Sequence, residues 1–378
     1  MKIIKGVVLA SVLILSACAP TFDKEEEIVQ TNENNKRETA FVPSFNVSEE
    51  EYKIIYPYKP SQARGVIVNQ MANRLDIDVF EVGLRDHAKS YFDPDLYFFQ
   101  EGQRIDSNTL YNWLSREGET SSGLNPVMEG PEDAIESHQE APKYLSHILE
   151  HDFLKKNEDG IVELKGMSIG IALKSTYRFQ TEVGGPYYYQ DIPEKVMVKE
   201  GKEIANEVIQ RIRQMEGLEE VPIVVALFRE EDQNAMSPGN FVAKTVVEVG
   251  GAVAKQWQDI DEDYVLFPSN EAAVNYNEES QLMQEFTDEI ARYFPNYVGV
   301  IGNGFYKDGE LAELNIQIPI EFQGKAEVVG FTQYVYGLVM ETFPNYFKVE
   351  VQIHSHQQQE SVIVREAGET DPFVYLYQ

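Results

Sequence analysis

The sequence of 378 residues contains a single cysteine, Cys18. One cysteine excludes an intramolecular disulfide and any zinc site built from cysteine ligands. Basic residues are also few: 32 Lys and Arg stand against 63 Asp and Glu, which gives a formal net charge of −31. Because so acidic a surface repels phosphate backbones, we expect no nucleic-acid partner.

Long apolar runs are missing as well, since no segment approaches the roughly 20 residues that span a bilayer. An apolar run without a charge, Gly6 to Ala17, follows a basic start that contains Lys2 and Lys5. A basic start, a short apolar run and small residues at its end are typical of a secretory signal. We therefore predict that residues 1–17 are a signal peptide, whose removal would increase the excess of acidic residues by two.

The signal ends in Leu15, Ser16 and Ala17 directly before Cys18, a pattern that looks like a bacterial lipobox. In that pattern the thiol of Cys18 receives a diacylglyceryl group and the chain is cut between Ala17 and Cys18. Stable anchoring takes two acyl chains, and this group supplies both. The pattern predicts a location on the extracellular face of the cell membrane, with the membrane, signal peptidase II and the lipoprotein-processing enzymes as partners. The alternative is an ordinary secretory signal with an incidental cysteine.

Residues 18–48 are hydrophilic and acidic and show no helical or strand period, which predicts a disordered tether. The remaining length is enough for two domains.

The folded part shows one pattern twice. A turn signal, Asp159-Gly160 or Asp308-Gly309, is followed by apolar residues that alternate at the same four offsets from the glycine. These residues are Met167, Ile169, Ile171 and Leu173 in the first copy and Ile316, Ile318, Ile320 and Phe322 in the second. Each copy predicts the half-buried second strand of a β-hairpin.

In each copy the hairpin is followed by an amphipathic helix and a further strand. The helix faces are Ile204, Val208, Ile212 and Met215, then Phe331, Val335, Leu338 and Val339; the strands are residues 223–228, then Phe347, Val349, Val351 and Ile353. We therefore predict an α+β fold of two related domains, residues 49–235 and 236–378, each a β-hairpin–helix–strand unit with extra helices. The alternative is a chance resemblance between two generic amphipathic patterns.

Several catalytic and metal-binding patterns are present but lack the context that their chemistry needs. Ser168 lies in a G-x-S-x-G match, yet it belongs to the alternating strand, where a hydrolase needs a sharp turn into a helix. The H-x-x-E-H match from His147 to His151 is predicted to lie on the solvent side of a helix that begins near Pro142.

The acidic run from Asp259 to Asp263 lacks the glycine and glutamate of a calcium loop, and His354 and His356 have no further ligand nearby. We expect no enzymatic activity, no cofactor and no metal site.

A possible binding loop contains Tyr187, Tyr188 and Tyr189, which follow two glycines and a proline in the stretch that is specific to the first copy. Exposed tyrosines on a rigid turn are typical of glycan and protein recognition. The alternative is that two of the rings cap the core.

The chain resembles the CamS family of Gram-positive surface lipoproteins, which are described as sex-pheromone precursors. The resemblance covers essentially the whole chain. The residues that carry the resemblance are the lipobox, the stretch that runs from Gly65-Val66-Ile67-Val68-Asn69 to Arg74-Leu75-Asp76, the segment Asp95 to Gly102, and the segment Lys143 to Glu150.

The resemblance implies that the pheromone is released from the discarded signal. Here it would be the peptide from Ser11 to Ala17, freed by signal peptidase II and an intramembrane protease. Two functions remain open: a lipid-anchored, non-enzymatic pheromone precursor, or an envelope binding module whose ectodomain recognises cell-wall glycan or a partner protein.

Overall fold

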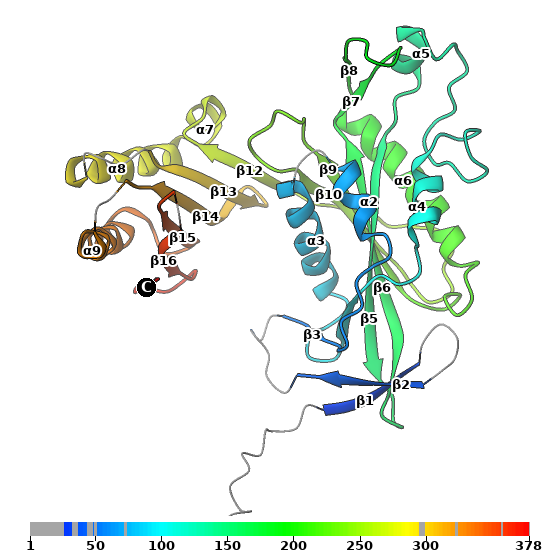
Figure 1. Ribbon diagram of the computed structural model, residues 1–378, viewed down its shortest axis with the longest axis horizontal. Coiled ribbons are helices and arrows are strands. Elements are labelled where there is room, and N and C mark those ends of the chain that lie inside the picture. The colour runs from blue at the N-terminus through cyan, green and yellow to red at the C-terminus, as the bar shows by residue number, and fades with distance from the viewer. Residues whose placement is uncertain are drawn as a thin grey trace, which may run out of the picture.

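The computed structural model describes residues 26–31, 37–43, 48, 51–71, 74–294, 299–321, 324–356 and 358–377. These residues form two domains, each built on one large β-sheet (Figure 1). The fold is therefore of the mixed α+β class that the sequence predicts. No helix in the described ranges is both long enough and apolar enough to cross a membrane.

The first domain has a nine-stranded sheet in the order β11-β10-β9-β6-β5-β4-β3, with β1 paired to both β2 and β6. Its strands are β1 (Glu26–Thr31), β2 (Arg37–Val42), β3 (Lys53–Ile54), β4 (Phe98–Glu101), β5 (Leu145–Lys156), β6 (Ile161–Lys174), β9 (Ile223–Glu230), β10 (Asn240–Val247) and β11 (Gln258–Asp259). Its helices are α2 (Arg64–Gln70), α3 (Arg74–Lys89), α4 (Ser107–Leu114), α5 (Ile135–Glu140) and α6 (Glu194–Ile212). A separate hairpin consists of β7 (Thr176–Phe179) and β8 (Tyr188–Asp191).

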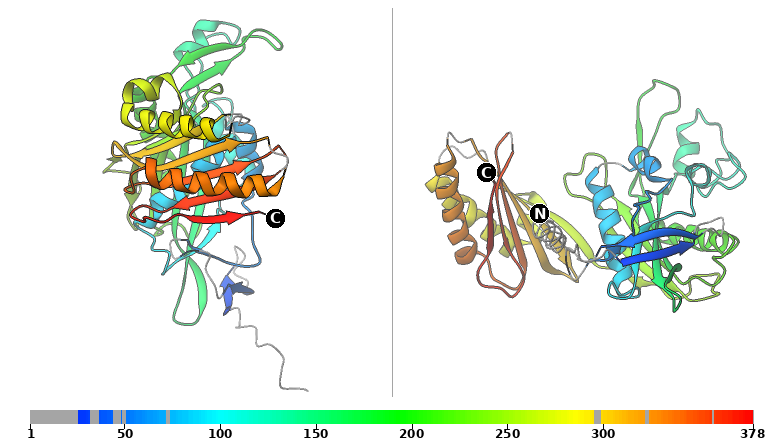
Figure 2. Two further views of the ribbon diagram at one scale, coloured as in Figure 1. Left: turned by 90° about the vertical axis from the view of Figure 1, so that its left-hand side faces the viewer. Right: turned by 60° about the horizontal axis from the view of Figure 1, so that its bottom comes forward.

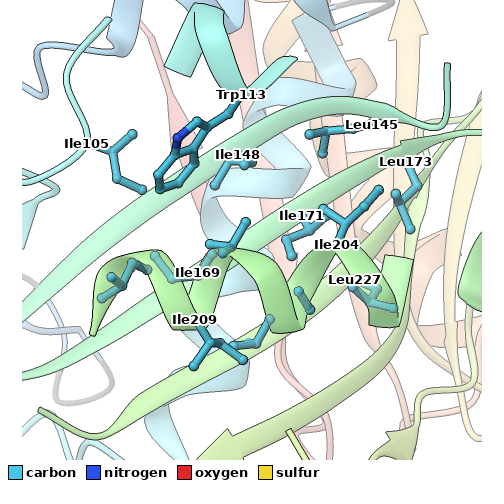
Figure 3. Close-up of a cluster of buried hydrophobic side chains, with 14 of the residues drawn as sticks. Ile105, Trp113, Leu145, Ile148, Ile169, Ile171, Leu173, Ile204, Ile209 and Leu227 are labelled. Carbon is cyan, nitrogen blue, oxygen red and sulfur yellow. The ribbon is translucent and has the colours of Figure 1, made fainter. Parts of the chain in front are cut away.

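Helices cover both faces of this sheet. On one face α4 and α6 bury a core that contains Trp113 and Ile209, and Figure 3 shows these side chains against the strands. On the other face α3 packs Phe80 and Leu84 against Ala172 of β6. The residues Met167 to Leu173 of β6 are therefore buried on both faces, whereas the alternation of apolar residues predicted a half-buried strand.

The second domain has a six-stranded sheet in the order β12-β13-β14-β15-β16-β17. Its elements are β12 (Glu262–Phe267), α7 (Asn270–Asn275), α8 (Asn277–Tyr293), β13 (Ile301–Lys307), β14 (Glu310–Pro319), α9 (Lys325–Thr342), β15 (Lys348–His354), β16 (Gln359–Arg365) and β17 (Phe373–Leu376). Along β15 the exposure alternates strictly, as expected for a sheet covered on one face. Figure 2 shows α8 and α9 on the face turned away from the first domain.

The two sheets repeat one topology. The path β4-β5-β6-β9-β10-β11 has the successive pairings antiparallel, antiparallel, parallel, antiparallel, antiparallel, and β12 to β17 have the same series. The parallel step is crossed by α6 in one domain and by α9 in the other. This repeat agrees with the duplication that the sequence pattern predicts; Phe322, one of its positions, lies outside the described residues.

The two predicted hairpins are present. In the β13–β14 turn Asp308 and Gly309 both have positive φ angles, 54° and 78°. This left-handed geometry suits a two-residue hairpin turn and explains the Asp-Gly pair. In the β5–β6 turn Gly160 has a φ of 77°, and the Asn157 side chain accepts hydrogen bonds from the backbone N–H groups of Asp159 and Ile161.

The structure places the domain boundary later in the chain than residue 236. Both β10 and β11 belong to the first sheet, so the chain passes between the domains from β11 into β12, near residue 260. Residues Met236 to Gly239, where the boundary was predicted, lie in the loop between β9 and β10. A Ser-Pro-Gly run is as typical of a hairpin loop as of a linker between domains, so the sequence signal was ambiguous. Across the boundary, the Nε2 atom of His87 lies 3.2 Å from an Oε1 atom of Glu262.

The structure also differs from the prediction that residues 18–48 are a disordered tether. Within residues 18–48 the structure has the hairpin of β1 and β2, and β1 runs parallel to β6 at Val29 and Gln30. Ala40 and Val42 are buried against Leu154 and Val162. The alternation of Ala40 and Val42 with exposed Thr39 and Phe41 is a two-residue period that the surrounding charges obscure.

Candidate functional site

The lipobox lies outside the described residues. This holds for Leu15, Ser16, Ala17 and Cys18, and for the whole peptide from Ser11 to Ala17. The sites that the structure describes therefore all belong to the ectodomain.

The tyrosine loop presents two rings to solvent and one to the protein. Tyr187 and Tyr189 are 53% and 48% exposed, whereas Tyr188 stacks on Phe179 with ring centroids 5.6 Å apart. The Arg178 guanidinium lies 4.6 Å from the centre of the Tyr187 ring. The Tyr189 hydroxyl accepts a hydrogen bond of 3.1 Å from the Gln233 amide. The two exposed rings are therefore held in place by polar neighbours, as a recognition surface requires.

The H-x-x-E-H residues lie on a strand and are buried, so the predicted solvent-exposed helix is wrong. His147, Glu150 and His151 belong to β5 and are 1%, 5% and 3% exposed. The spacing of Leu145, Ile148 and Leu149 suggested a helix face, but β5 is covered on both sides and its apolar residues do not alternate. Within the described ranges, no group of three or more His, Cys, Asp or Glu residues could hold a metal ion.

Burial keeps both histidines neutral. It lowers the pKa of His147 to about 3, and burial together with the charge of Arg85 lowers the pKa of His151 to about 3. Neither Nδ1 atom has a hydrogen-bond partner among the described residues. Each neutral ring carries one donor and one acceptor nitrogen, and both types of group are costly to bury unpaired.

Glu150 and Asp152, which alternate with the histidines along β5, form a pair of buried carboxyl groups, and Glu150 lines the same cavity as His147 and His151. The Glu150 carboxylate accepts hydrogen bonds from the backbone N–H groups of Arg104, at 3.1 Å, and Ile105, at 2.7 Å. Burial, and then the charge of Glu150, raise the pKa of Asp152 well above its usual range. Burial raises the pKa of Glu150 as well, so this buried pair retains a proton more readily than two exposed carboxyl groups would, and the Glu150 carboxyl group anchors the loop before α4.

A cavity of about 200 Å³ lies between α2, α3, β4 and β5, and we refer to it as the β5 cavity. His147 and His151 form part of its wall, together with Arg85 of α3 and Phe99 of β4. No local sequence pattern predicts this cavity, because its wall combines four separate stretches of the chain, within residues 54–67, 81–85, 99–105 and 147–151. The only local signal was the polar residues of the H-x-x-E-H match.

The G-x-S-x-G match is a packing feature. A Cβ atom on Gly166 would lie 2.2 Å from the Phe92 ring, and one on Gly170 would lie 2.6 Å from the Phe80 ring. Both glycines therefore let aromatic rings approach the sheet directly. Ser168, between them, is fully buried and its hydroxyl has no hydrogen-bond partner within the described ranges.

The chain is similar to a family of pheromone precursors and to two solved structures. The family model described as CamS sex pheromone cAM373 precursor matches residues 58–371. A sex pheromone precursor from Lactobacillus salivarius subsp. salivarius, solved as a crystal structure, is 30% identical with a TM-score of 0.83, over 90% of this chain and 99% of the other. The C-terminal domain of the sex pheromone staph-cAM373 precursor from Staphylococcus aureus is 28% identical with a TM-score of 0.72, over 82% of this chain and 98% of that one.

No curated protein matches the chain. The family match extends from the segment before α2 to the last strands of the second sheet and so includes both domains. Together with the similar folds, it confirms the resemblance that the sequence suggested. The chain belongs to the CamS sex pheromone cAM373 precursor family.

Proposed function

We propose that the protein is a lipid-anchored lipoprotein of the outer cell surface whose signal sequence is the source of a pheromone-like peptide. The observation that carries the proposal is the run Leu15-Ser16-Ala17-Cys18 at the end of a short apolar segment, in a chain of a precursor family. Signal peptidase II would cut before Cys18, and an intramembrane protease would then free Ser11 to Ala17. A short, apolar, uncharged peptide can leave a membrane and enter an apolar receptor pocket.

In this account the folded domains remain at the membrane after the peptide is released. The diacylglyceryl group on Cys18 supplies two acyl chains, at about 0.8 kcal/mol per buried CH₂, which is enough for stable anchoring. The residues between Cys18 and Glu26, the first residue of β1, connect the anchor to the first domain. We propose no catalytic role for the domains, because no described constellation joins a nucleophile, a base and an open site.

The Cys18→Ala variant tests the anchor. We expect this variant to take up no labelled fatty acid and to yield no mature lipoprotein in the membrane fraction, because the chain has no other thiol that can be acylated. Ser16→Ala is the matched control, since it keeps a small residue in the lipobox and should still be labelled. Fatty-acid labelling followed by fractionation gives both results, and equal labelling of Cys18→Ala would contradict the anchor.

A second function, recognition of an envelope glycan or protein by the ectodomain, is favoured by the tyrosine loop. Tyr187 and Tyr189 are exposed, and Arg178 and Gln233 hold them in place. Broad, stiff rings in fixed positions lose little conformational entropy on binding. This second function is compatible with peptide release, because the two involve different parts of the chain.

A further inference from the structure

The wall of the β5 cavity carries more negative than positive charge. Three acidic residues, Glu81 of α3, Glu101 of β4 and Glu150 of β5, stand against two basic residues, Arg64 of α2 and Arg85 of α3. The two histidines of the wall are neutral, because their pKa values are about 3. The wall therefore has a formal excess of one carboxylate.

Most of the charged groups of the wall already have partners. An Nη2 atom of Arg64 lies 3.6 Å from an Oε1 atom of Glu101, and an Nη2 atom of Arg85 lies 3.4 Å from an Oε2 atom of Glu51. The Glu150 carboxyl group accepts hydrogen bonds from two backbone N–H groups. The excess charge is therefore not located on these residues.

Glu81 carries the excess charge. Among the described residues it has neither a hydrogen bond nor an ion pair. Arg85 lies one helical turn further along α3, at a spacing that allows an ion pair with Glu81, but its guanidinium is paired with Glu51. Burial, and then the charge of Glu101, raise the pKa of Glu81. Because both effects oppose a negative charge on Glu81, a cation in the cavity would be attracted to this carboxylate and would stabilise its charged form.

The size of the cavity and its apolar surface limit the kind of cation. Its volume of about 200 Å³ equals that of six or seven water molecules, at about 30 Å³ each, so it accommodates a ligand of about six non-hydrogen atoms. Much of the remaining wall is apolar and consists of Ile54, Ile67, Phe99, Ile105, Ile148 and Leu149. No group of three or more His, Cys, Asp or Glu residues in the described ranges could hold a metal ion. An ammonium group on a short alkyl chain matches both parts of the wall, because the chain covers the apolar surface.

The segment that supplies Tyr58 and Ser61 to the wall is fixed in advance. The Glu101 carboxylate accepts hydrogen bonds from the Tyr58 hydroxyl and, at 2.6 Å, from the backbone N–H of Ser61. The Gln103 amide donates to the carbonyl oxygen of Lys59 at 3.2 Å. These bonds hold the loop before α2 against the end of β4, so little ordering remains to be done on binding.

From this geometry we propose that the β5 cavity binds a primary ammonium group on a short alkyl chain, with Glu81 as the carboxylate that accepts its hydrogen bonds. The site is separate from the signal peptide and from the tyrosine loop, so the inference goes beyond the precursor function and beyond recognition by that loop. The alkylammonium group belongs either to a free amine or to the side chain of a lysine.

Saturation-transfer NMR on the full-length protein in a nonionic detergent, with protein-free micelles as the blank, tests the proposal. The probes are pentylammonium, pentanol and pentanoate, which share one chain length and differ in the charge of the head group. We expect pentylammonium to bind with a dissociation constant of about 1 mM or below, and the other two at least about tenfold more weakly.

A fourth probe, Nα-acetyl-lysine amide, distinguishes the two sources of the alkylammonium group. Binding as tight as that of pentylammonium indicates a lysine side chain. Binding at least about tenfold weaker indicates a free amine.

Variants locate the site. Glu81→Gln should weaken the binding of pentylammonium about tenfold, because it removes the charge and keeps the size of the side chain. Asp78→Asn is the matched control, since Asp78 is an exposed residue of the same helix and is not part of the wall. This control should change binding by less than about twofold.

A third variant has the opposite expected effect. Arg64→Gln releases Glu101 from its ion pair and leaves a second carboxylate of the wall without a cation. It should strengthen the binding of pentylammonium about threefold. Because Arg64 is exposed, this variant also decides the question if Glu81→Gln does not fold by tryptophan fluorescence.

Four results would overturn the proposal: no binding of pentylammonium to the folded protein, equally tight binding of pentanol or pentanoate, equal losses in Glu81→Gln and Asp78→Asn, or weaker binding in Arg64→Gln.

Discussion

Acidification from pH 6 to pH 4 is expected to destabilise the first domain strongly, because His147 and His151 are neutral and buried. Their pKa values in the folded state are about 3, below the usual value of 6.5. The unfolded chain therefore binds more protons between these values, and the free energy of unfolding falls as the pH falls through this window. The expected loss approaches about 1.4 kcal/mol per pH unit for each histidine.

Asp152 acts in the opposite direction, since its folded pKa is raised and acid favours its folded form. The contribution of the histidines is therefore measured as a difference between variants. The double variant His147→Gln, His151→Gln should flatten the pH dependence, whereas His356→Gln, an exposed residue of the second domain, should not.

Of the two tryptophans of the chain, Trp113 lies in the core of the first domain and Trp257 packs against that core, so their fluorescence in denaturant titrations reports the unfolding of this domain. An unchanged slope in the double variant would contradict the account of these histidines.

The Gly166→Ala substitution is expected to lower the free energy of unfolding of the first domain by about 1–3 kcal/mol or more. Its new Cβ atom would lie 2.2 Å from a carbon of the Phe92 ring, and Phe92 is fully buried and stacked on Phe153 with centroids 4.5 Å apart. Because the Phe92 ring is fully buried, the ring or the segment after α3 that contains it must shift to make room. Denaturant titration followed by tryptophan fluorescence measures the loss.

Two controls accompany this variant. Gly65→Ala, in α2 with no atom within 4 Å of its Cβ, should keep stability or raise it by up to about 1 kcal/mol. Ser168→Ala removes a buried hydroxyl that has no hydrogen-bond partner in the described part of the chain, and it should leave stability unchanged or higher. A large loss in Ser168→Ala together with a mild effect of Gly166→Ala would show that the serine, and not the glycine spacing, explains the motif.

The sequence predicted the elements that have a short and regular period. The turns at Gly160 and Gly309, the faces of α6 and α9, and the buried strands β9 and β15 all follow from local patterns. The helix predicted around His147 was wrong, and the sequence itself contains evidence for a strand there. A hairpin turn at Asp159-Gly160 needs a first strand as well as a second, and that strand is β5.

The β5 cavity could not be predicted in the same way. Its wall joins residues from Ile54 to His151 that come together only when α2 and α3 pack on the sheet. The late domain boundary has a similar cause, because β10 joins the first sheet by pairing with β9, and β11 then pairs with β10. Such contacts are properties of the assembled fold rather than of a local pattern.

The most direct test of the precursor function is mass spectrometry of culture supernatant from the strain that makes the protein, beside a strain that carries Cys18→Ala. The account predicts the peptide Ser11 to Ala17 in the first supernatant and its absence from the second. Accumulation of mature lipoprotein without any released peptide would contradict the precursor function for this chain.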